Sequence, residues 1–134
     1  MSRSVLVVDD VAFVRKTLAA ILSEAGFEVV GEAANGVDAV EQYTRLRPSL
    51  VTMDIVMPKL SGIEATRKII KADPQAKIVM VSAMGQETLV MESIHAGARD
   101  YVLKPFSANE VIQTLEHCLS GGNGPRAERE QKIG

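Results

Sequence analysis

The sequence is short of several residue types, and each shortage excludes a class of protein. It contains a single cysteine, Cys118, and no tryptophan, so it has neither an internal disulfide framework nor a multi-cysteine zinc site. Its 15 basic and 17 acidic residues give a net charge of −2, without the basic excess that is typical of nucleic-acid-binding proteins. No apolar run approaches the ~20 residues that span a bilayer. We therefore expect a protein of the reducing cytoplasm that binds neither nucleic acid nor membrane.

The residues that are present indicate one α/β domain. A chain of 134 residues has the size of a single domain, and short apolar runs alternate along it with amphipathic segments of helical length. The expected strands cover residues 5–8, 27–30, 50–53, 78–81 and 101–103, and the expected helices begin near residues 12, 37, 61, 86 and 107. This alternation predicts a parallel sheet that helices cover on both faces. We assign residues 1–120 to this domain and residues 121–134, rich in glycine and charge, to a flexible tail or a cloning remnant.

Polar side chains stand where the expected strands end. Asp9 and Asp10 follow the first apolar run, Asp54 the third, Ser82 the fourth and Lys104 the last. Because open parallel sheets bind ligands at the carboxyl ends of their strands, we expect these five side chains to converge. Each has an ordinary interpretation on its own: Asp10 could cap the following helix, and the others could be solvated loop residues. Their joint placement favours a functional site.

The chemistry of this set points to phosphoryl transfer. Three clustered carboxylates raise one another's pKa unless a cation lies among them. Oxygen ligands without histidine or cysteine favour Mg²⁺, with Mn²⁺ as the alternative ion. A lysine and a hydroxyl are groups that stabilise phosphoryl oxygens. The sequence has no GxxxxGK[ST] or GxGxxG motif for a nucleotide, so we expect a carboxylate nucleophile that forms an aspartyl-phosphate.

Four blocks of sequence carry a resemblance to a known family. They are VLVVDD, VTMDIVMPKLSG, VMVSAMG and DYVLKPF, and they occur in this order within residues 4–119. Together they resemble the receiver domain of two-component response regulators. The resemblance implies a doubly wound (βα)5 fold of the flavodoxin type, with five parallel strands in the order 2-1-3-4-5 and helices on both faces. It also implies Mg²⁺-dependent transfer of a phosphoryl group from a histidine kinase to an aspartate.

The resemblance assigns the acceptor and the metal ligands residue by residue. Asp54 matches the phosphoacceptor, and Asp9 and Asp10 match the acidic pair that precedes the first helix. Asp10 is expected to bind magnesium directly and Asp9 mainly through water. Asp54 completes the metal site together with the backbone carbonyl of Val56.

The resemblance also assigns the groups that read the phosphoryl group. Lys104 and Ser82 are expected to bind phosphoryl oxygens, and the peptide bond between Lys104 and Pro105 is expected to be cis. Tyr101 matches the aromatic switch residue, which turns inward when Ser82 moves toward the phosphoryl group. The alternative for Tyr101 is a purely structural aromatic of the core.

Two apolar residues stand near the acceptor where many relatives have polar ones. They are Val56, two residues after Asp54, and Met84, two residues after Ser82. Polar side chains there can orient a hydrolytic water, so apolar ones predict slow self-dephosphorylation. The alternative is that both residues only shape the rim of the site.

The stretches VTMDIVMP and SAMGQE are most similar to chemotaxis response regulators of the CheY type. This implies a monomeric, single-domain signalling module that is not an enzyme beyond its own phosphorylation and slow dephosphorylation. Its donor would be a CheA-like histidine kinase. Its target would be a flagellar motor switch protein, bound through the surface of the fourth helix, fifth strand and fifth helix.

Other functions remain open at this point. The same fold could serve in a phosphorelay or regulate another machine, such as a pilus or a kinase. A more remote alternative is a Mg²⁺-dependent phosphatase with an aspartyl-phosphate intermediate. The adjacent pair Asp9-Asp10 disfavours it, because phosphatases of the haloacid dehalogenase type have a DxD motif there.

Overall fold

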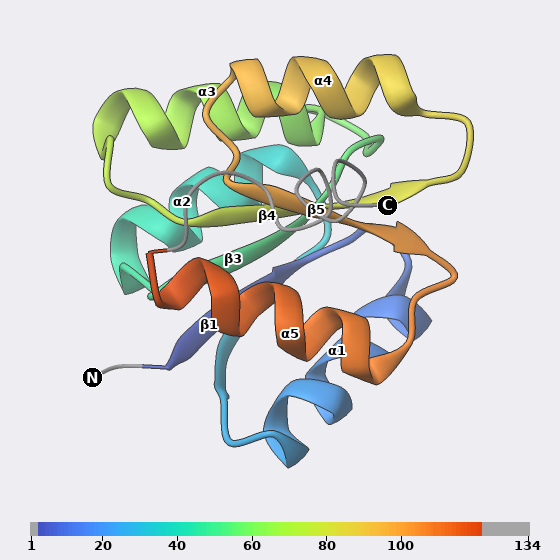
Figure 1. Cartoon of the computed structure of the whole chain (residues 1–134). Coiled ribbons are helices and arrows are strands. Elements are labelled where there is room, and N and C mark those ends of the chain that lie inside the picture. Colours follow the sequence, from blue (N-terminus) through green and yellow to red (C-terminus); the bar gives the residue numbers. More distant parts are fainter. Residues whose placement is uncertain (1–2, 122–134) are drawn as a thin grey trace.

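The computed structural model describes residues 3–121, and strands alternate with helices along them (Figure 1). Five parallel strands form one sheet in the order β2-β1-β3-β4-β5, which confirms the predicted topology. The strands are β1 (Ser4–Val8), β2 (Glu28–Ala33), β3 (Leu50–Asp54), β4 (Ile78–Ala83) and β5 (Asp100–Lys104). The helices are α1 (Ala12–Glu24), α2 (Gly36–Leu46), α3 (Gly62–Ala72), α4 (Glu87–His95) and α5 (Ala108–Leu119). The tail predicted over 121–134 lies outside the described residues, except for Gly121.

Helices α1 and α5 cover one face of the sheet, and α2, α3 and α4 cover the other (Figure 1). Strand β2 extends to Ala33, past its predicted end at residue 30, because Gly31 and Glu32 interrupt the apolar run on which the prediction rested. Glu32 lies at the edge of the sheet, and its carboxylate pairs with Arg15 and Lys16 of α1, each at 3.1 Å. Within the part of the chain that the structure describes, no helix is both long and apolar enough to cross a membrane.

Serine side chains cap two of the helices, at the residues near which the sequence predicts that these helices begin. The Ser61 hydroxyl accepts a hydrogen bond from the backbone amide of Glu64 at 3.2 Å, and the Ser107 hydroxyl accepts one from that of Glu110 at 3.1 Å. Each bond satisfies an amide that the first turn of a helix leaves without a partner. These caps determine where α3 and α5 begin.

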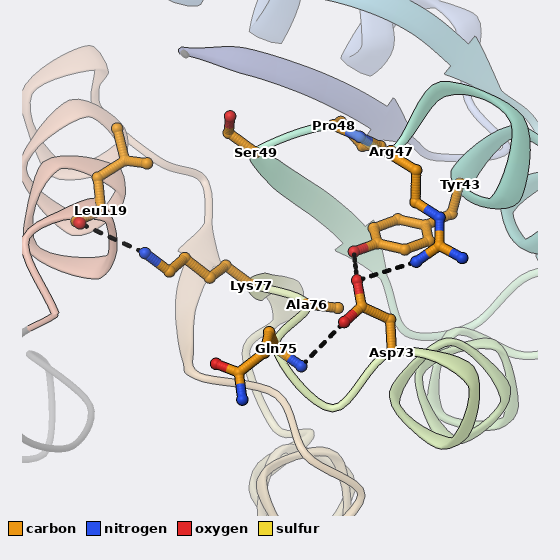
Figure 2. Close-up of a pocket in the computed structure, with 9 residues that line it drawn as sticks. All are labelled: Tyr43, Arg47, Pro48, Ser49, Asp73, Gln75, Ala76, Lys77 and Leu119. Atoms are coloured by element: carbon orange, nitrogen blue, oxygen red, sulfur yellow. Dashed lines mark hydrogen bonds and ion pairs between the residues drawn. The ribbon is translucent and has the colours of Figure 1, made fainter. Parts of the chain in front are cut away.

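The amino edge of the sheet, where the strands begin, holds a polar pocket of about 370 Å³ (Figure 2). Asp73 lies in its wall. The carboxylate of Asp73 accepts hydrogen bonds from the Tyr43 hydroxyl at 2.7 Å, the Arg47 guanidinium at 3.2 Å and the backbone amide of Gln75 at 3.1 Å. These donors, with Tyr43 the strongest, hold the pKa of Asp73 below its usual value. The network ties α2 to the loop that follows α3.

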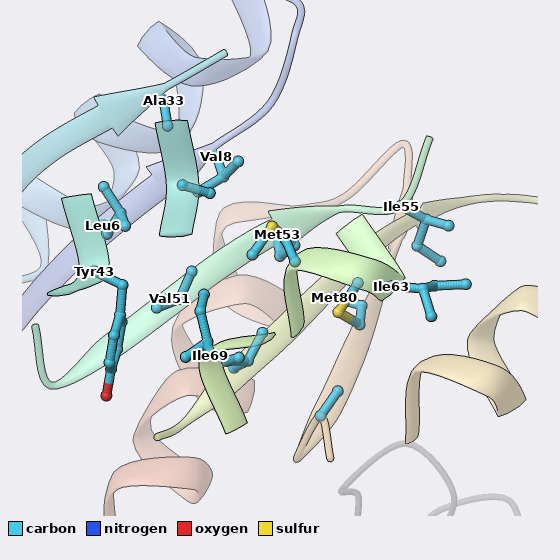
Figure 3. Packing of buried hydrophobic residues seen from close by; sticks show 14 of the residues in the cluster. Leu6, Val8, Ala33, Tyr43, Val51, Met53, Ile55, Ile63, Ile69 and Met80 are labelled. Atoms are coloured by element: carbon cyan, nitrogen blue, oxygen red, sulfur yellow. The ribbon is translucent and has the colours of Figure 1, made fainter. Parts of the chain in front are cut away.

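Apolar packing covers the central strands on both faces. Alternate residues of β1, β3 and β4, including Leu6, Val51 and Met80, belong to one apolar cluster with residues of α2 and α3, such as Tyr43 and Ile69 (Figure 3). The intervening residues of these strands pack against α1 and α5. Each fully buried aliphatic side chain contributes about 1.5–3 kcal/mol relative to an exposed one. The central strands are therefore rigid supports for the residues at their carboxyl ends.

Candidate phosphoryl-acceptor and metal site

Strand register brings the predicted acidic residues together. Val8 of β1 pairs with Met53 of β3, so the residues that follow them in the chain, Asp9 and Asp54, are neighbours at the carboxyl edge. Each of the three acidic residues, Asp9, Asp10 and Asp54, offers one carboxylate oxygen, and these oxygens lie within 4.8 Å of one another. Such a group of hard oxygen donors fits a divalent cation of the magnesium type.

Asp54 lies in an environment that disfavours its ionised form. It is only 8% exposed, and one of its oxygens accepts a hydrogen bond from the Ile55 amide at 3.0 Å. Burial, followed by the charge of Asp9, raises the pKa of Asp54 to about 7, while Lys104 acts in the opposite direction and Asp10 adds to the rise. The carboxylates therefore carry more negative charge than the nearby lysine compensates, as expected for a site that takes a cation.

Asp9 is held by groups of the protein itself. It is fully buried, and its two carboxylate oxygens accept hydrogen bonds from the Val11 amide at 2.9 Å and from Lys104 Nζ at 3.0 Å. Val11 is the N-cap of α1 and makes no side-chain capping bond, so the interpretation of Asp10 as a helix cap is wrong. Asp10 is exposed beside the other two carboxylates.

Lys104 reaches the acidic cluster from the end of β5. Its ammonium lies 3.0 Å from Asp9 and 3.6 Å from Asp54. Burial alone would lower the pKa of Lys104, but the hydrogen bond to Asp9 and the charges of both carboxylates outweigh it and raise that pKa. The ammonium is thus charged and held beside the candidate acceptor. The peptide bond from Lys104 to Pro105 is cis, as the resemblance implied.

Ser82 is placed differently from the other predicted residues. Its side chain is fully buried, and its hydroxyl lies 3.1 Å from the side-chain oxygen of Gln86 and 3.0 Å from the backbone oxygen of Ala83. These contacts hold the hydroxyl within its own loop rather than on the Asp54 carboxylate. Its phosphoryl-binding role remains a prediction.

The rim of the site is apolar at both predicted positions. Val56 is 58% exposed and Met84 is 75% exposed. Sequence reasoning missed two further exposed apolar residues near the acidic pair, Val11 and Phe13. Tyr101 is half-buried and packs against the apolar cluster under α2, α3 and α4.

Gly62 is a residue of the site that sequence reasoning missed. A Cβ atom at this position would collide with the backbone oxygen of Asp54, and the Gly62 amide donates a hydrogen bond to the Ile55 carbonyl at 2.7 Å. Only glycine therefore lets α3 begin directly against the end of β3. A glycine in the first turn of a helix, where it is a poor helix former, was the available signal.

Comparison with known proteins agrees with this geometry. Residues 5–116 match the family described as response regulator receiver domain. The chain is 52% identical over 115 residues to the chemotaxis protein CheY of Thermotoga maritima, which covers 86% of this chain and 96% of that protein. It is 48% identical over 120 residues to CheY of Bacillus subtilis, covering 90% of this chain and all of that protein.

A solved structure that contains CheY is also similar to this chain. A chain of the CheX-CheY-BeF3-Mg²⁺ complex from Borrelia burgdorferi superposes with a TM-score of 0.79 at 38% identity, covering 82% of this chain and 84% of that one. The chain described here belongs to the response regulator receiver domain family. Within this family it is a receiver of the CheY type, a signalling module of two-component chemotaxis systems.

Proposed function

We propose that the chain accepts a phosphoryl group on Asp54 and signals by phosphorylation-dependent protein binding in chemotaxis. The observation that carries this proposal is the position of Asp54 at the end of a buried strand. Its carboxylate lies 3.6 Å from the Lys104 ammonium and within reach of two further carboxylates. This arrangement offers a nucleophilic oxygen, a fixed positive charge and the ligands for a cation in one place.

The chain's own residues would act together in the transfer. An Asp54 oxygen forms a bond to phosphorus while the phosphorus–nitrogen bond of a phosphohistidine breaks, and the leaving imidazole takes up a proton. Asp10, Asp54 and the Val56 carbonyl would hold Mg²⁺, with Asp9 acting through water. The bound ion would supply positive charge to the phosphoryl oxygens. Lys104, held by Asp9, stabilises the same oxygens from the side of β5.

The phosphoryl group would then alter the surface of α4, β5 and α5. It adds about −1.5 to −2 charges, which attracts the Ser82 hydroxyl and opens space for Tyr101 to turn inward. Met91 of α4 and Leu103 of β5 are exposed apolar side chains on these elements, and they support this surface as the partner site. A partner that prefers the phosphorylated conformation shifts the population toward it.

The partners follow from this chemistry and from the relatives. A CheA-like histidine kinase would be the donor, and a flagellar motor switch protein would be the target. The Borrelia burgdorferi structure contains CheX with CheY, which supports protein partners for receivers of this type. We place the chain in the cytoplasm as a monomer that catalyses only its own phosphorylation and slow dephosphorylation.

Binding to the N-terminal peptide of the source organism's flagellar switch protein tests the proposal. The assay compares the protein with Mg²⁺ alone, with Mg²⁺ and beryllofluoride, and an Asp54→Ala variant with both. Tighter binding by the activated wild type alone is expected. No binding in any state, with beryllofluoride shown to occupy the site, would refute the motor target and leave the receiver chemistry in place.

The apolar rim suggests a long-lived phosphorylated state. The side chains of Val56 and Met84 offer no hydrogen-bonding group to a hydrolytic water. A double variant, Val56→Asn with Met84→Glu, is expected to speed loss of the phosphoryl group about 10-fold or more, which is less than the full effect of a positioned acid–base group. Decay is measured by phosphate release after removal of the donor, with Phe13→Asn as the control for polarity elsewhere on the rim. An unchanged rate in the double variant would show that these residues only shape the surface.

A further inference from the structure

The loop that joins β4 to α4 contains hydrogen bonds that the transfer chemistry does not use. The side-chain oxygen of Gln86 accepts one bond from the Ser82 hydroxyl at 3.1 Å and another from the Ala83 backbone amide at 2.8 Å. Ser82 is fully buried, so its hydroxyl requires a partner within the protein. The Ala83 carbonyl, 3.0 Å away, is the other acceptor in reach of its single proton, whereas the Ala83 amide is bonded to the Gln86 oxygen. A single neutral oxygen therefore binds two donors at the carboxyl end of β4.

These two donors lie next to the candidate acceptor. Asp54 pairs in the sheet with Val81, the residue that directly precedes Ser82. A phosphoryl group has three strongly accepting oxygens and about −1.5 to −2 charges. Hydrogen bonds to such a group are roughly twice as strong as those to a neutral amide. A phosphoryl group on Asp54 and the side chain of Gln86 are therefore competitors for the same donors.

We propose that Gln86 is a positioning residue whose side-chain oxygen holds the Ser82 hydroxyl and the Ala83 amide in the unphosphorylated state. Phosphorylation replaces this oxygen with a phosphoryl oxygen and releases the Gln86 side chain. The strength of the resting contact thus sets how readily the site is activated. This inference rests on the proposed function, because it takes Asp54 as the acceptor.

The position of Gln86 also connects the site to α4. Its backbone carbonyl accepts a hydrogen bond from the Val90 amide at 2.9 Å, in the first turn of the helix. Its side chain does not cap that helix but reaches back to the end of β4. The preceding Gly85 has a φ of 89° and no atom within 4 Å of where its Cβ would lie. The loop therefore has room to move, and the Gln86 side chain tethers it in the resting state.

Two substitutions of Gln86 are expected to act in opposite directions. Gln86→Leu removes the competing oxygen at similar size, so the affinity for beryllofluoride in the presence of Mg²⁺ should rise about 3- to 10-fold, the equivalent of one or two ordinary hydrogen bonds. Gln86→Glu keeps the oxygen and adds negative charge, so the affinity should fall. Calorimetric titration measures both, and Gln75→Leu, the same change at the amino edge, is the control.

Two further measurements separate this role from a structural one. In the metal-free protein, hydrogen exchange of the Ala83 amide should be faster in Gln86→Leu and remain protected in Gln86→Glu. In a Ser82→Ala background, the gain in affinity from Gln86→Leu should shrink, because one of the two contested donors is gone. The exchange measurement does not depend on Asp54 and applies to any folded variant.

The outcomes distinguish the inference from the proposed function. Equal beryllofluoride affinities in wild type, Gln86→Leu and Gln86→Glu would overturn the role of Gln86, as would changes of the same sign in both variants. Unchanged Ala83 exchange in Gln86→Leu would overturn the resting contact itself. A wild-type protein that binds no beryllofluoride would instead overturn the proposed function, and with it the competition.

Discussion

The two edges of the sheet use the same residue type in opposite ways. At the amino edge, Asp73 accepts hydrogen bonds from Tyr43, Gln75 and Arg47, and its pKa is lowered. At the carboxyl edge, Asp54 is buried beside another carboxylate, and its pKa is raised to about 7. The folded chain itself supplies the donors that stabilise the charge of Asp73. At Asp54, the nearby ammonium of Lys104 does not offset burial and the charge of Asp9.

This difference separates a structural carboxylate from a reactive one. Asp73 links α2 to the loop after α3 and contributes to folding. Asp54 is held in place by the buried strand β3 although its surroundings disfavour its charge. Perturbed groups of this kind cluster at functional sites, because a cation or a phosphoryl group supplies the missing interactions.

The largest effect is expected from removing the reactive carboxylate. Asp54→Asn should abolish phosphorylation by a low-molecular-weight acyl phosphate with Mg²⁺, because an amide oxygen is a poor nucleophile for this transfer. The matched change Asp73→Asn should leave phosphorylation unchanged. Protein mass after incubation measures both. Full phosphorylation of Asp54→Asn would contradict the contrast between the two edges.

The next effect is expected from removing the fixed positive charge. Lys104→Met should slow phosphorylation about 100-fold or more, as removal of a preorganised charge-stabilising group commonly does. Rapid-quench kinetics with saturating Mg²⁺ measures the rate. Lys77→Met is the control, because it removes the same charge at the amino edge, where the Lys77 ammonium lies 3.4 Å from the Leu119 carbonyl and away from Asp54. A similar loss in both variants would indicate a general effect of charge rather than a local one.

The raised pKa of Asp54 predicts a dependence of stability on pH without metal. In the unfolded chain the pKa is about 3.9, so the folded state binds more protons between that value and about 7. The stability of the metal-free protein should therefore fall as pH rises through this range. Asp54→Asn should be more stable than wild type at pH 8, and the gain should disappear near pH 4. Denaturant unfolding at several pH values measures this difference, and a gain that is constant with pH would contradict it.

The smallest effect is expected at the amino edge, with the opposite sign. The lowered pKa of Asp73 means that its ionised form contributes stability above its unfolded pKa, about 3.9. That contribution is lost as pH falls through the folded pKa. Asp73→Asn should therefore lower the melting temperature modestly at neutral pH and converge with wild type in acid. Thermal unfolding over this pH range provides the test. A variant as stable as wild type at pH 7 would show that the network contributes nothing.

The sequence predicts the fold and the acidic cluster well, for identifiable reasons. Strands β1 and β3 are buried on both faces, so they appear as nearly continuous apolar runs. Asp9 directly follows β1, and Asp54 is the last residue of β3. Strand β2 was predicted too short because Glu32, at the sheet edge, is polar. The pattern of apolar residues reflects which positions are buried. An edge strand such as β2 is only partly buried, so the pattern marks only part of its length.

Features that depend on side-chain direction could not be predicted. Nothing in the stretch SAMGQE shows that the Gln86 side chain turns back to Ser82 instead of toward solvent. The network around Asp73 joins Tyr43 to a residue 30 positions later, and only the packing of α2 beside α3 brings them together. Local patterns carry no signal for such contacts.

The most direct test of phosphorylation at the carboxyl edge is to locate the phosphoryl group. The protein is phosphorylated by an acyl phosphate with Mg²⁺, reduced with borohydride to convert an aspartyl-phosphate to homoserine, and analysed by peptide mass spectrometry. Homoserine at position 54, dependent on Mg²⁺ and absent at position 73, is the predicted result. Modification of His95 or His117, or of an aspartate other than Asp54, would contradict the account.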